Sequence, residues 1–268
     1  MQAFFDATAD GYRFCLLRQP PDDVAPRGAI VFIQPFAEEM NKSRRMAALG
    51  ARALAAAGFT TLQLDLRGCG DSSGDFGEAS WNDWIADVLR AIDHVRGESS
   101  LPCWLWALRA GALLVPAVVE QRPQMNVLLW QPVVSGQQHL TQFLRLKAAA
   151  GIIGTSAGAS TQVLKAKLAA GESVEVAGYR LAPALANGLA AAELKLPAGF
   201  GGRIDWFEVS NEADASLSLP AQQRVDALRA AGVRVQAEVV KGEPFWQTVE
   251  ITDCEPLIER TVACLSEA

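Results

Sequence analysis

The chain has 268 residues, of which 50% are hydrophobic and 20% charged, a composition typical of a globular protein with one large core. Its formal net charge of −6 argues against a nucleic-acid-binding protein, which usually needs a basic face. No apolar run reaches the roughly 18 residues of a membrane span, so we expect none.

The N-terminal segment 1–13 has neither a basic start nor an apolar core, so we expect the protein to be cytoplasmic and not exported. The cysteines are odd in number, scattered and without metal-ligand spacing. We therefore expect reduced thiols and neither a metal nor an organic cofactor. The five cysteines are Cys15, Cys69, Cys103, Cys254 and Cys264.

Short apolar runs alternate with helix-period stretches along most of the chain. This alternation predicts a parallel sheet with right-handed crossovers. The runs predict strands at 14–19, 29–35, 59–66, 102–108, 126–133, 203–210 and 233–240. The helical stretches are 44–58, 81–97, 110–121, 219–232 and a C-terminal segment from 246, which Pro256 is expected to kink or divide.

The alternation breaks at about Ser135 and resumes after about Leu196. The segment between them is rich in Ala and Gly, with three helical patches and a short extended piece at 173–181. Its stretch 151–160, "GIIGTSAGAS", is expected to be a mobile connection. We predict a cap insertion at 135–196 between two parts of one core, 1–134 and 197–268.

The order of these strands and helices resembles the α/β-hydrolase fold, and three motifs resemble its serine-aminopeptidase-like branch. They are "LDLRGCGDSSG" (64–74), "WALRAGALL" (106–114) and "IQPFAEEMNKSRRMAALGARAL" (33–54). The third also resembles the exosortase A system-associated hydrolases of type 2, which occur with bacterial exopolysaccharide loci. The resemblance implies a mostly parallel eight-stranded sheet with helices on both faces and a helical cap.

The second motif stands where the fold carries its nucleophile elbow, G-x-S-x-G. Small residues flank the elbow here as Ala107 and Gly111, but Arg109 occupies the serine position. A guanidinium is cationic at physiological pH and cannot attack a carbonyl. Neither Leu108 nor Ala110, which flank Arg109, offers a hydroxyl or thiol as a substitute.

The other members of a triad are also in question. Asp214, with Glu212 nearby, fits the acid position after the seventh strand, although it also suits a solvated loop. The base position after the eighth strand holds Glu243 followed by proline instead of histidine. His94 is expected far from the strand ends. His139 lies in the cap, where it either overhangs the site or sits on a helix surface.

A cation at the start of a helix is unfavourable unless an anion compensates it. The candidates are Glu38, Glu39, Asp214 and Glu243. Either such a carboxylate locks Arg109 in a salt bridge that plugs the site, or Arg109 binds a ligand anion such as phosphate or carboxylate. A different catalytic use of Arg109 is a third interpretation.

The loop "EEMNKSRR" allows two interpretations. In one, Asn41 or Ser43 caps the next helix and the charges are solvated. In the other, Glu39 and Arg44 form a polar network with Arg109. By position, the expected ligand-binding residues are Phe36, Glu38, Asn41, Arg44, Leu108, Arg109 and Ala110.

The loop at 67–74 is expected to be mainly structural, with Asp71 and Ser72 fixing it, while Cys69 is a candidate reactive thiol. Two functions follow from these residues. The first is a non-hydrolytic member that binds a small or acidic ligand, such as a saccharide or acyl precursor, or a partner protein. The second is an esterase- or thioesterase-like enzyme in which Glu39, Glu243 or Asp214 activates water and Arg109 stabilises the oxyanion.

Overall fold

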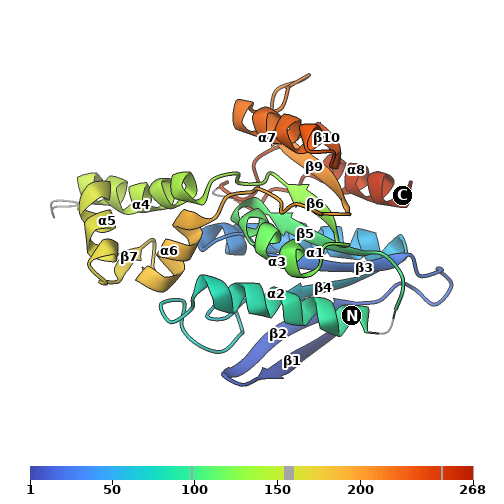
Figure 1. The fold of residues 1–268 in the computed structure, drawn as a ribbon, viewed down its shortest axis with the longest axis horizontal. Helices are drawn as coiled ribbons and strands as arrows, with labels where there is room; N and C mark the ends of the chain where they lie inside the picture. Colours follow the sequence, from blue (N-terminus) through green and yellow to red (C-terminus); the bar gives the residue numbers. More distant parts are fainter. Residues whose placement is uncertain (98, 154–159, 249, 268) are drawn as a thin grey trace.

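A computed structural model of the protein describes residues 1–97, 99–153, 160–248 and 250–267. Its main sheet has the strand order β1-β2-β4-β3-β5-β6-β9-β10 (Figure 1). The pairs β1–β2 and β2–β4 are antiparallel, and the remaining pairs are parallel. The strands are β1 (Gln2–Thr8), β2 (Gly11–Arg18), β3 (Gly28–Ile33), β4 (Phe59–Leu64), β5 (Cys103–Leu108), β6 (Asn126–Trp130), β9 (Arg203–Ser210) and β10 (Arg234–Lys241).

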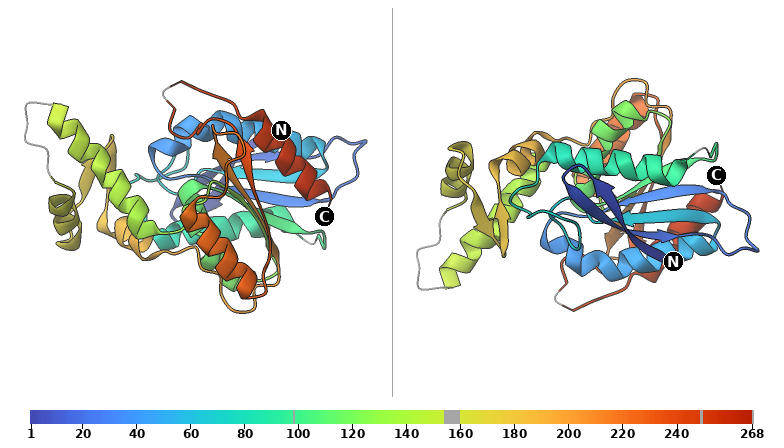
Figure 2. Two further views of the ribbon diagram at one scale, coloured as in Figure 1. Left: turned by 90° about the horizontal axis from the view of Figure 1, so that it is seen from above. Right: turned by 90° about the horizontal axis from the view of Figure 1, so that it is seen from below.

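Helices cover both faces of this sheet because its central strands are apolar on both sides (Figure 2). Neighbouring strand residues point to opposite faces, so Ile30 and Val31 belong to two different hydrophobic clusters. The Ile30 cluster packs against α1 (Glu38–Ala56) and α8 (Glu255–Ser266). The Val31 cluster packs against the other face, under α2 (Trp81–Arg96), α3 (Val115–Gln121) and α7 (Leu219–Ala230).

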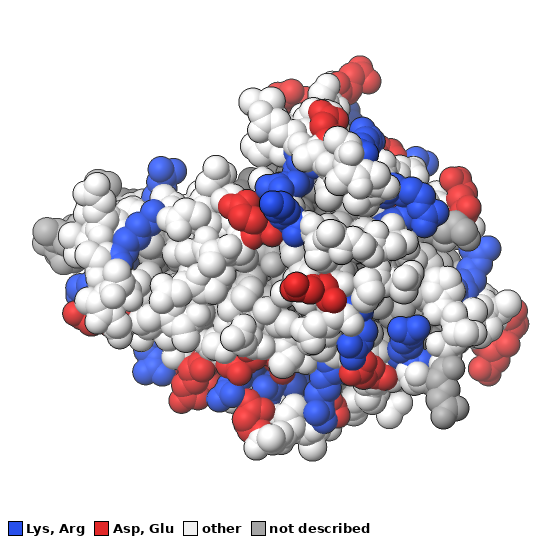
Figure 3. Space-filling model, in the orientation of Figure 1, with Lys and Arg blue, Asp and Glu red and all other residues white. Residues whose placement is uncertain are grey.

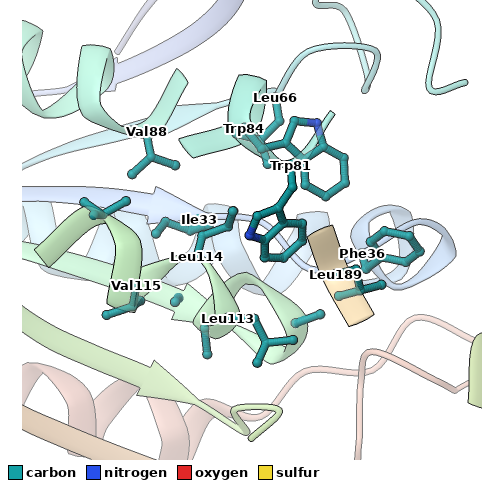
Figure 4. Close-up of a cluster of buried hydrophobic side chains, with 14 of the residues drawn as sticks. Ile33, Phe36, Leu66, Trp81, Trp84, Val88, Leu113, Leu114, Val115 and Leu189 are labelled. Carbon is teal, nitrogen blue, oxygen red and sulfur yellow. The ribbon is translucent and has the colours of Figure 1, made fainter. Parts of the chain in front are cut away.

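The cap lies between β6 and β9 in the sequence and extends beyond one end of the sheet (Figure 1). Figure 4 shows Trp81 of α2 and Leu189 of α6 in one buried cluster, which joins the cap to the core. Gly188 allows this contact, since a Cβ there would lie 2.1 Å from the Cβ of Trp81. The cap elements are α4 (Gly136–Ile153), α5 (Thr161–Ala169), the hairpin β7 (Val174–Val176) and β8 (Tyr179–Leu181), and α6 (Pro183–Ala191).

Several element boundaries differ from the sequence predictions. The N-terminal residues form the edge strand β1, which was not predicted. Helix α1 begins at Glu38, so Asn41 and Ser43 lie inside it and cap nothing; the acidic first turn favours this early start. Pro256 lies in the first turn of α8 instead of kinking a longer helix, because proline at a first turn loses no hydrogen bond.

The predicted mobile connection at 151–160 is described only in part. Residues 151–153 continue α4, and 154–159 lie outside the described residues. Within the described ranges, none of the helices combines the length and the apolar character needed to cross a bilayer. Acidic and basic side chains are interspersed along the edges of the face drawn in Figure 3, and its centre is largely uncharged.

Candidate functional site

A sharp turn joins β5 to the helix that follows it, at the edge of the sheet nearest the cap. Arg109 is at its tip with φ of 54°, a left-handed conformation that is costly for a residue with a Cβ. The next residues form a 3₁₀ turn, Arg109–Leu113, before α3 begins. Gly111 makes the turn possible, because a Cβ there would lie 2.6 Å from the Gln34 carbonyl oxygen.

Arg109 is held on three sides by protein groups. Its Nε and Nη2 donate to Glu39 Oε1 over 3.1 and 3.0 Å, and its Nη1 donates to the Gln131 carbonyl oxygen over 3.5 Å. Its guanidinium carbon lies 5.3 Å from the ring centre of Trp246, within cation–π range. Glu39 is therefore the carboxylate that compensates the cation at the elbow.

Glu39 and its neighbour Glu38 lie in the first turn of α1, and both line the cavity beside the elbow. Burial raises the pKa of Glu39, and the charge of Arg109 counteracts part of this effect. Burial also raises the pKa of Glu38. The second oxygen of each, Oε2, is buried and has no hydrogen-bond partner among the described residues.

His139 of α4 enters the same site from the cap. Its ring packs edge-on against Phe36, with centroids 5.8 Å apart, and only 6% of the residue is exposed. Burial, together with the nearby charge of Arg109, lowers the pKa of His139 to about 3, so the imidazole is neutral at physiological pH. Within the described ranges, neither ring nitrogen has a hydrogen-bond partner.

These side chains surround a cavity of about 270 Å³. Its wall combines charged groups of both signs with aromatic rings, and it is built by α1, the elbow, the cap helix α4 and the loop after β10. The ion pair therefore stands beside open volume and does not fill the site. The wall residues used below are Phe36, Glu38, Glu39, Lys42, Arg109, His139 and Trp246.

A family model described as serine aminopeptidase, S33, matches residues 24–230, which is most of the chain. The chain belongs to this α/β-hydrolase family. A search among curated proteins found no match.

Solved α/β-hydrolase structures have the same fold along nearly the whole chain. Est1E from Butyrivibrio proteoclasticus, solved with ferulic acid bound, is 13% identical with a TM-score of 0.63, and the match covers 99% of this chain and 97% of that one. A soluble variant of monoglyceride lipase from Saccharomyces cerevisiae, solved with a substrate analogue, is 8% identical with a TM-score of 0.65 over 99% and 94%. The α/β-hydrolase domain-containing protein 10 from mouse is 13% identical with a TM-score of 0.58 over 100% and 98%. Identities this low show the fold alone.

Not all the sequence-predicted residues meet in this α/β-hydrolase site. Phe36, Glu38, Glu39 and Arg109 line the cavity together, and Leu108 and Ala110 are buried beside the tip. Four predicted residues lie outside the lining of the cavity: Asn41, Arg44, Asp214 and Glu243. Asn41 donates to Tyr179 Oη, and Asp214 and Glu243 are exposed.

The predicted network of Arg44 with Arg109 is wrong. Arg44 pairs with Asp65 at 3.2 Å and faces another part of the molecule. Helix geometry explains this, since a residue five positions after Glu39 lies well around the helix from it. Asp214 is on an exposed loop with φ of 58°, and neither it nor Glu243 is among the residues that line the cavity.

Several wall residues of this α/β-hydrolase site were not among the predicted site residues, and Lys42 and Trp246 are two of them. Trp246 follows the segment in which a histidine was sought, and it covers Arg109. Of the two interpretations of His139, the structure fits the one in which it overhangs the site, because it is buried and lines the cavity; the interpretation as a surface residue is wrong. Its spacing of four from the buried Phe143 could have revealed this, because both lie on the apolar face of α4.

The loop at 67–74 supports the site without lining it. Ser72 Oγ donates to the Asp65 carbonyl oxygen over 2.5 Å and accepts from the Phe14 amide over 2.9 Å. Asp71 takes part through its backbone amide, which donates to Asp65 Oδ2. Burial raises the pKa of the Cys69 thiol to about 12, so this cysteine is not a reactive thiolate.

Proposed function

We propose that this α/β-hydrolase binds a small, neutral, hydroxyl-rich ligand at its elbow and does not hydrolyse it through a serine–histidine–acid triad. One observation carries the proposal: Arg109 occupies the tip of the elbow in the left-handed conformation, beside a cavity of about 270 Å³. A guanidinium there supplies hydrogen-bond donors and no nucleophile. Glu243 and Pro244 stand at the position after the eighth strand where a triad would need its histidine.

The charges of the cavity favour a neutral ligand. Arg109 and Lys42 are balanced by Glu38 and Glu39, so there is no excess positive charge to attract an anion. An acidic group would also have to displace Glu39 from two nitrogens of Arg109. Of the ligands considered, a saccharide therefore has more support than a phosphate or carboxylate.

The free hydrogen-bonding groups favour hydroxyls. Glu38 Oε2, Glu39 Oε2 and one His139 nitrogen are acceptors without a partner among the described residues. Lys42 and the Nη1 of Arg109 make only long contacts of 3.3 and 3.5 Å. A hydroxyl can donate to the first set and accept from the second, and the Phe36 ring supplies an apolar wall. The resemblance to exosortase-associated hydrolases supports a role beside exopolysaccharide synthesis.

A second candidate function is ester or thioester hydrolysis without a covalent intermediate. Glu39 favours it, because its pKa is raised by burial and its Oε2 is free to accept a proton from water. Arg109 would then stabilise the oxyanion that forms. Its guanidinium is already engaged by Glu39, and this competition makes the binding function the better supported of the two.

Calorimetric titration with neutral monosaccharides and with the matching uronic acids tests the binding function. We expect the neutral sugars to bind more tightly, and Glu39→Gln to weaken their binding at least about tenfold through loss of a charged acceptor. Glu175→Gln, on the exposed hairpin, is the matched control and should bind as the native chain does.

One further measurement separates the two candidate functions, and another tests the assumption that they share. Turnover of short acyl esters that disappears in both Glu39→Gln and Arg109→Met would establish the hydrolase and overturn the binding proposal. Labelling by a serine-directed fluorophosphonate would contradict both, since each assigns no nucleophilic serine to the elbow.

A further inference from the structure

A second cavity, of about 210 Å³, lies away from Arg109 on the other side of α1. The helix divides the two spaces: Glu39 faces the first, whereas Met40, Ser43 and Ala47 face the second. The opposite wall comes from the sheet, through residues of β2, β3 and β4. Most of this wall is apolar, and its main side chains are Phe14, Leu16, Phe32 and Leu64.

Three polar atoms in this apolar wall lack partners among the described residues. They are Gln34 Oε1, Ser43 Oγ and Gln63 Oε1, all buried. Gln34 is 5% exposed and Ser43 only 1% exposed, so solvent does not reach them freely. An unpaired buried polar atom costs stability unless a bound molecule completes its hydrogen bonds. Their position in one cavity indicates a site built for a polar head on an apolar body.

The charge of that head follows from the same wall. The two amide oxygens are acceptors and call for a donor. The cation of the wall, Arg44, is paired with Asp65 at 3.2 Å and so offers no free charge to an anionic head. A cationic head is disfavoured as well, because Asp65, the carboxylate of the cavity, is occupied by Arg44 at 3.2 Å and by the Asp71 amide at 2.9 Å. The complementary head is neutral and donates a hydrogen bond.

We propose that this cavity is a second ligand site, which takes a small neutral amphiphile: one ring or a short chain that carries a hydroxyl or an amide N–H. Its size agrees with this class, since an apolar cavity of about 150 Å³ is enough to hold benzene. The ring lies against Phe14, Phe32 and Ala47, and the head reaches Ser43 and the glutamine oxygens. The site is independent of the function proposed for the Arg109 cavity.

Three probes with the same ring and different heads test the proposal: benzyl alcohol, toluene and benzoate. Each is titrated at millimolar concentration into the full chain, and binding is followed by the amide resonances of α1 and β4. We expect saturable shifts there with benzyl alcohol, affinity for toluene weaker by about three- to tenfold through loss of one hydrogen bond, and weaker binding still of benzoate. Benzoate binding as tightly as benzyl alcohol, or no saturable shift with any probe, overturns the proposal.

Two variants locate the site. Ala47→Phe fills the cavity and should abolish binding of all three probes, while the same change at Ala230, exposed on α7, should leave it unchanged. Ser43→Ala should weaken benzyl alcohol about three- to tenfold and leave toluene unaffected, so this test stands even if Ala47→Phe fails to fold. Unaltered binding to a folded Ala47→Phe, or equal effects of Ser43→Ala on both probes, contradicts the assignment.

Discussion

Arg109 and Glu39 form an ion pair that is almost removed from solvent, with side chains 16% and 12% exposed. Such a pair is not a large source of stability by itself, since both charges lose their hydration. It is costly to break, because the remaining partner is then a buried charge without compensation. The pair therefore holds the tip of the elbow to the start of α1, mainly because losing either partner is costly.

Arg109→Ala should lower the free energy of unfolding by about 3 kcal/mol at neutral pH, measured by chemical denaturation. The control is the surface pair of Arg260 and Glu238, whose side chains are 47% and 32% exposed. Arg260→Ala should lower the free energy of unfolding by less than about 1 kcal/mol. Equal losses in the two variants would show that the elbow pair is solvated like a surface pair.

His139 predicts a pH dependence of stability. Its pKa is about 3 in the folded chain and ordinarily 6.5, so the unfolded chain takes up the proton first as the pH falls. The stability that His139 contributes is therefore complete above about pH 6.5 and is lost as the pH falls toward about 3. Well below pH 6.5 the loss approaches about 1.4 kcal/mol for each pH unit.

His139→Gln should remove this part of the pH dependence, as measured by denaturation at several pH values. The control is His94→Gln: His94 is exposed on α2 and stacks on Phe4, and its variant should keep the native slope. If His139→Gln and the native chain lose stability in parallel below pH 6.5, the imidazole is not buried as described.

At the scale of elements, the elbow depends on how closely β5 and its following helix approach β3. Gly111 lies against the backbone at the end of β3, where a Cβ would be 2.6 Å from the Gln34 oxygen and 2.7 Å from the Ile33 oxygen. Both neighbours are backbone atoms, which cannot move aside as a flexible side chain does. The position of Arg109 therefore depends on a glycine two residues later.

Gly111→Ala should destabilise the protein by about 1–3 kcal/mol through this overpacking, although alanine normally favours a helix. The expected change is a lower midpoint of thermal unfolding, together with shifted resonances at the elbow. A variant as stable as the native chain would mean that the elbow relaxes without cost.

At the scale of the whole molecule, two hydrophobic layers on opposite faces of the sheet bury every one of the five cysteines. Burial raises the pKa of the Cys15 and Cys264 thiols to about 12 and that of Cys103 to about 11. Thiolates, not thiols, react with disulfide reagents. Reactivity should therefore report on opening of the fold.

An aromatic disulfide reagent at about pH 8 should label none of the five cysteines of the native chain rapidly, and all five in guanidinium chloride. The slow native reaction should follow the rate or equilibrium of unfolding. A thiol that reacts at once in the native chain would contradict this prediction and show a local opening of the fold. Peptide mapping would identify that cysteine and so locate the opening.

The sequence by itself determined the fold class, because strand and helix periodicity are local and the alternation of the two leads to a parallel sheet. The resemblance of 106–114 to the nucleophile elbow of the α/β-hydrolase fold also placed Arg109 at the turn, since the small residues that flank a sharp turn are visible in the local sequence. Glu39 was one of four candidate partners, and local pattern could not choose among them.

Only the tertiary structure decided the partner and the wall of the site. Glu39, Trp246 and His139 come from α1, the loop after β10 and the cap, and their meeting depends on how these distant segments pack. The same holds for Arg44, which helix geometry turns toward Asp65, and for the exposed Asp214. The sequence pattern indicates which face of a helix or strand is apolar. The wall of a pocket is formed by side chains from distant segments, which come together only when the whole chain folds.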